Sequence, residues 1–177
     1  MYRLLGGPFF PDDVICVVPE AGRGLRWLEV RPPKIIVGMS LTPDLITTFP
    51  QSSLVFPAII DTGCNTGFEI DQKHLVLWTG TSETLFDFLK HHDRSDGRSH
   101  VTRKANILLH LEPYTGPRFV GPRMPFHLMR TDQITVMDRS GPEPYPRFPL
   151  LGLKAFMDNN LRVLVEGGAS EFTIYEG

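Results

Sequence analysis

The sequence has 177 residues, which is long enough for one domain with a real core and short for two. Hydrophobic residues make up 41% and charged residues 21%, the composition of a soluble globular protein and not of a disordered one. The formal net charge of −2 comes without a concentrated basic stripe, so nucleic acid is not an expected partner. The mixed-charge run at 94–105 is interpreted as a solvated hairpin.

The cysteines and histidines show no pattern that indicates a disulfide framework or a metal site. Cys16 and Cys64 are the two cysteines, and none of the six histidines falls at a ligand spacing, so we expect no cofactor. The first residues lack the pattern of a signal peptide, and no apolar run approaches the length of a membrane span. We therefore expect a cytoplasmic protein without a membrane partner.

Frequent proline and glycine divide the chain into short pieces. Residues 1–24 show little periodicity and are expected to form an N-terminal extension, an extended arm ahead of one domain at 25–177. Pro57 interrupts one β-like segment, which predicts a sheet edge or a bulge there. The segments with strand character lie at 24–30, 34–41, 53–60, 105–113, 125–130, 133–138, 161–167 and 171–177.

Two segments have helical character. Residues 81–92 combine a possible Ser82 cap with apolar side chains at helical spacing, and residues 153–160 form a second, shorter candidate. The flap candidate described below competes with the first helix for the same residues. Many short strands with one or two brief helices predict an all-β, barrel-like domain.

The most informative stretch is 55–70, where an apolar strand leads to Asp61, Thr62 and Gly63. An acid at the end of a buried strand is costly unless it is exposed, paired or put to use. Asp and Gly are also common turn residues, so a plain strand-to-turn corner remains an alternative to a functional motif.

A second element follows near the C-terminus, where Leu150, Leu151 and Gly152 precede a short helical segment and two strands. In this order the two elements resemble those of retropepsin-like, retroviral-type aspartic proteases, over roughly residues 30–177. The resemblance implies an all-β fold, a closed acid-protease barrel with one short C-terminal helix. It also implies that the strand ending in Gly152 passes through the loop that follows the Asp-Thr-Gly motif.

The resemblance implies an aspartic endopeptidase whose catalytic motif is Asp61, Thr62 and Gly63. Two-lobed relatives carry two such motifs in one chain, whereas this chain has one, which predicts a homodimer with Asp61 of each copy facing its mate across a two-fold axis. The paired carboxyls would activate a water for attack on a peptide or protein substrate, without a metal.

Two further roles follow from the resemblance. The hydroxyl of Thr62 would hydrogen-bond across the dimer, and a polar hairpin with its tip at 94–99 is the candidate flap over an extended substrate.

Two alternatives stay open. One is a non-catalytic dimerisation or peptide-binding module with the retropepsin fold. The other is a small β-barrel scaffold in which the Asp-Thr-Gly sequence is coincidental.

Overall fold

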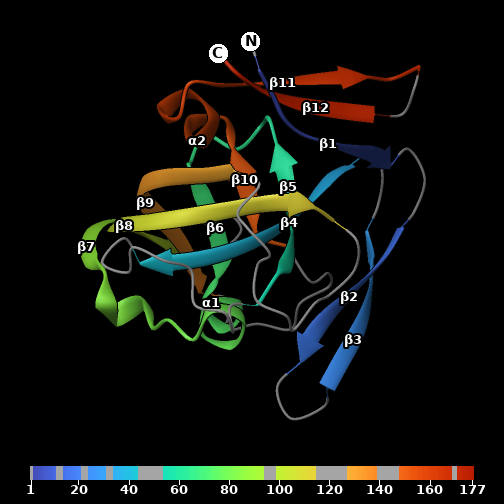
Figure 1. Ribbon diagram of the computed structural model, residues 1–177. Coiled ribbons are helices and arrows are strands. Elements are labelled where there is room, and N and C mark those ends of the chain that lie inside the picture. The colour runs from blue at the N-terminus through green and yellow to red at the C-terminus, as the bar shows by residue number, and fades with distance from the viewer. Residues whose placement is uncertain are drawn as a thin grey trace.

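The computed structural model describes residues 2–10, 14–20, 24–30, 34–43, 54–93, 99–114, 127–138, 148–168 and 171–177. The fold is mostly β, with few helices (Figure 1). Its helical elements are α1 (Gln72–Thr79), the 3-10 helix η1 (Glu83–Leu85) and α2 (Leu153–Asp158). Its strands are β1 (Tyr2–Phe10), β2 (Val14–Glu20), β3 (Gly24–Val30), β4 (Lys34–Pro43), β5 (Phe56–Asp61), β6 (Phe68–Asp71), β7 (Asp87–Asp93), β8 (Ser99–Pro113), β9 (His127–Asp138), β10 (Leu150–Gly152), β11 (Leu161–Glu166) and β12 (Glu171–Glu176).

Six strands close into a barrel in the order β4-β5-β10-β6-β9-β8, and a pairing between β8 and β4 completes the ring. β7 extends the sheet beyond β8. On the other side β1, β12 and β11 continue the sheet from β4 and form a layer at one end of the barrel (Figure 1). The predicted β-rich architecture with a closed barrel is therefore confirmed.

Large apolar side chains fill the barrel interior. Burying each of them removes enough apolar surface from water to contribute about 1.5 to 3 kcal/mol. Trp78 of α1 is buried with them, its ring centroid 5.3 Å from that of Phe56, and so attaches the helix to the barrel. Fully buried members of this core include Ile36, Met39, Phe56, Phe68, Ile70, Leu109, Leu111 and Ile134.

Pro57 lies in the barrel strand β5 at a point where β5 is paired on one side only, so the predicted edge is present locally and the alternative, a bulge, is not. It pairs with Gly38 in an unbroken β4–β5 register, and both its neighbours in β5 are buried. Proline is tolerated here because β10 begins to pair with β5 only at Ile59, two residues further on. The missing N–H of Pro57 therefore removes no hydrogen bond to β10.

The helices differ in part from the prediction. The helix expected at 153–160 is present as α2. The helix expected at 81–92 is wrong: Ser82 does accept a hydrogen bond from the Thr84 amide, but it caps only the single turn η1, after which β7 begins. Helix α1 was not predicted, and it ends at Gly80, whose φ of 68° is left-handed.

Two strand expectations also change. The segments 125–130 and 133–138 belong to one strand, β9, which passes an irregularity opposite Lys104 and Ile107 of β8. Residues 2–10, expected in an extended arm, form β1, which pairs with β12 and then with β4. This segment is thus part of the main sheet, while β2 pairs with β3 as a separate hairpin (Figure 1).

Candidate active site

Asp61 is the last residue of β5, and it is half-buried where the five residues before it are buried. Its carbonyl oxygen accepts a hydrogen bond from the Cys64 amide at 3.1 Å, which closes a four-residue turn. Its carboxylate oxygen Oδ1 accepts from the Gly63 amide at 2.9 Å. The strand therefore ends in a turn that holds the carboxylate in a fixed direction while leaving it reachable from solvent.

Gly63 is exposed and does not adopt a left-handed φ. A Cβ at this position would lie 3.3 Å from Asp61 Oδ1, which is tighter than an ordinary contact. The absence of a side chain thus matters for the close approach of its amide to the Asp61 carboxylate.

Thr62 occupies the outer position of the same turn and is exposed. Within the described part of the chain, its hydroxyl makes no hydrogen bond. This threonine is therefore an exposed residue of the turn that carries Asp61.

Strand β10 lies between the two strands that flank this turn. It runs parallel to β5, with Gly152 opposite Asp61, and antiparallel to β6, with Leu151 opposite Phe68. The chain after Asp61 must therefore cross over β10 to reach β6. The strand that ends in Gly152 does run between the two arms of the loop after Asp-Thr-Gly, which is the arrangement that the resemblance implied.

The crossing is tight at Gly152. A Cβ there would stand 2.0 Å from the Thr66 carbonyl oxygen and 2.5 Å from that of Cys64. The two segments are also hydrogen-bonded, because the Gly152 amide donates to Gly67 and the Leu153 amide donates to Cys64. These bonds attach the turn after Asp61 to the start of α2.

Cys64 packs beneath the turn with 8% of its surface exposed. Its Sγ lies 3.0 Å from Thr66 Oγ1 and 4.0 Å from Glu69 Oε2. Burial raises the pKa of the Cys64 thiol, and the negative charges of Glu69 and Asp61 add to the rise while the hydrogen bonds to Thr66 oppose it. A neutral, buried thiol supports the turn by packing.

The strands β7 and β8 form the hairpin that was the flap candidate. Strand β7 occupies the second half of the segment 81–92, where the competing helix was expected. The predicted tip of the hairpin, apart from Ser99, lies outside the described residues. Leu85 and Phe88, at the start of this hairpin, are 70% and 62% exposed, so large apolar side chains face solvent here.

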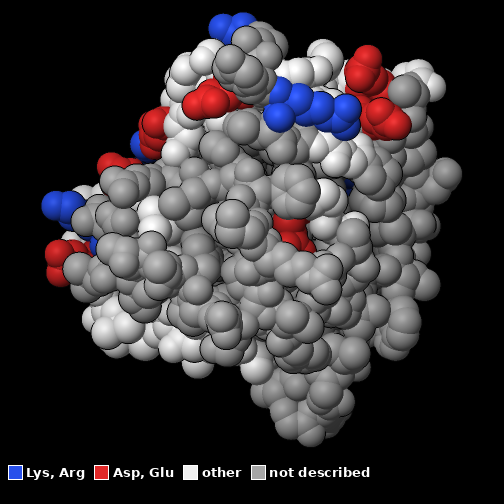
Figure 2. Space-filling view, in the orientation of Figure 1, with Lys and Arg blue, Asp and Glu red and all other residues white. Residues whose placement is uncertain are grey.

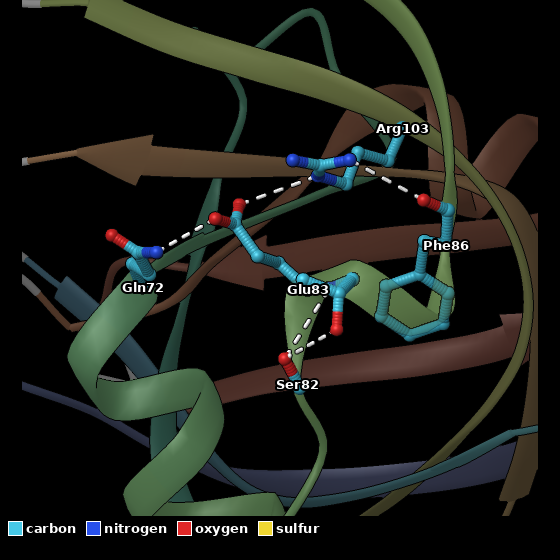
Figure 3. Close-up of polar contacts among 6 residues, drawn as sticks. Gln72, Ser82, Glu83, Phe86 and Arg103 are labelled. Atoms are coloured by element: carbon cyan, nitrogen blue, oxygen red, sulfur yellow. Dashed lines mark hydrogen bonds and ion pairs between the residues drawn. The ribbon is translucent and has the colours of Figure 1, made fainter.

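A polar cluster that sequence reasoning missed holds the base of this hairpin (Figure 3). Glu83 accepts from Gln72 Nε2 at 2.6 Å and from Arg103 Nε at 3.3 Å. Arg103 also donates from Nη1 to the Phe86 carbonyl at 3.3 Å. The cluster, which we call the hairpin-root cluster, joins α1, η1 and β8, and no sequence spacing would have indicated it because its members are brought together only by the fold.

Two negative findings apply to the described ranges. No three His, Cys, Asp or Glu side chains there gather in a way that could hold a metal ion. Likewise, none of the helices described is both long and apolar enough to cross a membrane.

No family model matches the chain, and no curated protein or solved structure is significantly similar to it.

Proposed function

We propose that the protein is a homodimeric aspartic endopeptidase of the retropepsin-like kind, in which Asp61 of each copy contributes one carboxyl to the active site. The observation that carries the proposal is the position of Asp61: a half-exposed acid on a hydrogen-bonded turn that β10 and Gly152 hold against the barrel. A fold that fixes one carboxylate this firmly favours a chemical role over a chance turn.

The need for two copies follows from the chemistry. A single carboxylate can remove a proton from water, but peptide hydrolysis also needs an acid at the carbonyl oxygen. Two carboxyls in close contact share one proton, because ionising both would place like charges side by side. Asp61 from two chains would supply the base and the acid together.

In the proposed reaction the ionised carboxylate accepts a proton from water while the water oxygen bonds to the peptide carbonyl carbon. The protonated carboxyl gives its proton to the carbonyl oxygen, which yields a neutral tetrahedral diol. A carboxyl of the dyad then gives its proton to the peptide nitrogen as the C–N bond breaks, while one diol hydroxyl returns a proton to the other carboxylate, and the products are an amine and a carboxylic acid. The dyad ends with one shared proton, as it began, and no metal takes part.

The substrate would bind in an extended conformation and add its main-chain hydrogen bonds to the strands around the site. The β7–β8 hairpin is the proposed flap. The exposed Phe88 of β7 and Leu85 of η1 just before it fit a substrate with apolar side chains.

The decisive variant is Asp61→Asn. Asparagine keeps a side-chain oxygen that can accept from the Gly63 amide, so the turn and the fold should survive while the base is lost. We expect cleavage of a broad peptide library by the wild type, and a loss of roughly a thousandfold or more in kcat/KM for the variant.

Asp132→Asn is the matched control, because it makes the same change at an exposed carboxylate of β9 whose ion-pair partner is Lys154 of α2. It should retain wild-type activity. If Asp61→Asn cleaves as well as this control, the aspartic mechanism is wrong. A wild-type dimer that binds peptides without cleaving them would instead favour the non-catalytic module.

A further inference from the structure

We infer that the outer edge of β11 pairs antiparallel with β11 of a second copy of this chain, with Leu164 at the two-fold axis. The inference deepens the proposed function and rests on it for one point, namely that a site with a single Asp61 is incomplete without a partner. The pairing itself follows from the strand and its charges.

β11 is the last strand of the ten-stranded sheet in the described part of the chain, and it bonds there on one side only, to β12. The other side of β12 is occupied by β1 of the same chain. A partner chain therefore cannot insert beside β12, and β11 offers the open row of backbone N–H and C=O groups at this end of the sheet.

The opposite end of the sheet is less suited to pairing. The β7–β8 register shifts between Phe88 and Lys90, and such an irregularity twists an edge away from a neighbour. The β11–β12 register is continuous from Leu161 to Glu166. β11 is thus the straighter edge.

The side chains of β11 divide between two faces. Leu161 is buried and Val163 packs against the core, so this side of β11 faces inward at the start of the strand, whereas Val165 near its end is 45% exposed. Arg162, Leu164 and Glu166 occupy the outer face and are all exposed. Leu164 is 47% exposed, an apolar residue between two charged ones of opposite sign.

This sequence is complementary to itself in one antiparallel register. With Leu164 opposite the partner's Leu164, Arg162 lies opposite the partner's Glu166, and the symmetry repeats that ion pair on the other side of the axis. Opposite charges directly across a ladder stabilise it, and like charges destabilise it. The pattern Arg-Val-Leu-Val-Glu therefore favours this register over a shift of two residues.

The single chain also has a local charge conflict that the pairing relieves. Glu166 lies directly opposite Glu171 in the β11–β12 register. Figure 2 shows acidic side chains in the region where this hairpin lies in Figure 1, with a basic side chain beside them. In the proposed register the partner's Arg162 comes next to Glu166 and places a positive charge in this acidic row.

The edge is also connected to the candidate site by a short path. β11 follows α2 after a turn at Asn160, and the first residue of α2, Leu153, donates to the carbonyl of Cys64 in the turn after Asp61. One rigid helix therefore separates the proposed interface from the proposed dyad.

Charge reversal tests the register directly. In the proposed register, a homodimer of the R162E variant would contain two Glu–Glu pairs. A homodimer of the E166R variant would contain two Arg–Arg pairs. We expect each variant to raise the dimer dissociation constant roughly tenfold or more in sedimentation experiments at low salt. An equimolar mixture should dimerise with near wild-type affinity, because the mixed dimer contains only opposite-charge pairs. The double variant R162E/E166R should do the same by itself.

Lys90→Glu is the matched control, an exposed charge reversal on β7 at the far end of the sheet, and it should leave the dissociation constant unchanged. Thermal unfolding of each variant checks that it folds. A monomeric wild type, or a mixture that is no tighter than the separate variants, overturns the inference. If the mixture restores dimerisation but no peptide is cleaved, the proposed function is wrong and the interface stands. If peptides are cleaved but the mixture does not restore dimerisation, the interface is wrong and the proposed function stands.

Discussion

Gly152 passes so close to Thr66 that a side chain on Gly152 would meet the Thr66 backbone: the distance from a Cβ to the carbonyl oxygen would be 2.0 Å. Backbone surrounds this position on two sides, because the Cys64 carbonyl would lie at 2.5 Å. Neither atom can move without opening the turn that carries Asp61. The glycine is required by space, not by an unusual backbone angle.

Gly152→Ala should therefore destabilise the protein severely. Overpacking against backbone that cannot yield costs about 3 kcal/mol or more, so we expect a large drop in the urea midpoint or failure to fold. Gly167→Ala is the control, because a Cβ there meets nothing within 4 Å. Equal stability of the two variants would show that the loop does not close over β10.

The hairpin-root cluster gives a second prediction. Glu83→Gln should lower the free energy of unfolding by about 1 to 2 kcal/mol, because Arg103 would lose its charged partner in a largely shielded place. We also expect faster amide hydrogen exchange in β7. A double-mutant cycle with Arg103→Gln measures the coupling, and a coupling energy near zero contradicts the role given to this pair.

The control for the cluster is Glu176→Gln, which removes the same charge from an exposed position in β12. Hydrogen exchange in β7 should not change in this variant. A rise as large as that in Glu83→Gln would mean that the effect is one of net charge.

The raised pKa of the Cys64 thiol predicts that the stability of the fold depends on pH. This pKa is raised in the folded state, so above about pH 8.5 the unfolded chain releases this proton while the folded chain retains it. Deprotonation then favours unfolding, and the free energy of unfolding should fall as the pH rises. Cys64→Ala should flatten this part of the curve in urea titrations between pH 8 and pH 10, and parallel curves would contradict the assignment.

Gly80 ends α1 in a left-handed conformation with open space around it. Gly80→Ala should cost about 1 kcal/mol through backbone strain alone, and Gly80→Asn should cost less because asparagine tolerates this conformation better. Thermal unfolding of both variants checks the order. If alanine is the milder replacement, the helix does not end as described.

The sequence predicted the placement of Gly152 beside Asp61 better than it predicted the helices. The two short motifs at Asp61 and Gly152 carry the family resemblance, and that resemblance implied neighbouring strands here, as the pairing of β10 with β5 has them. The false helix at 81–92 shows how local signals fail: Ser82 is a genuine cap, yet β8 provides a strand partner for the residues after Phe86. Pairing across the sheet therefore prevailed over helical spacing.

The missed helix α1 had usable signals at both ends. Asp71 stands at its N-cap position and Gly80 at its C-cap position, but the apolar residues between them are not confined to one face, since Val76 and Leu77 are exposed. The role of residues 2–10 could not be predicted at all. β1 pairs with β12 at the other end of the chain, and such a contact leaves no local pattern.

The hydrogen bond from Leu153 to Cys64 has a consequence for regulation. If two copies join through β11, a ligand that binds at the turn after Asp61 would act on a segment bonded to the first residue of the helix that leads to the interface. Binding and assembly would then be thermodynamically linked, and a ligand that tightens the dimer must itself bind the dimer more tightly by the same factor. Protein concentration would become a control on activity, with dilution as the off state.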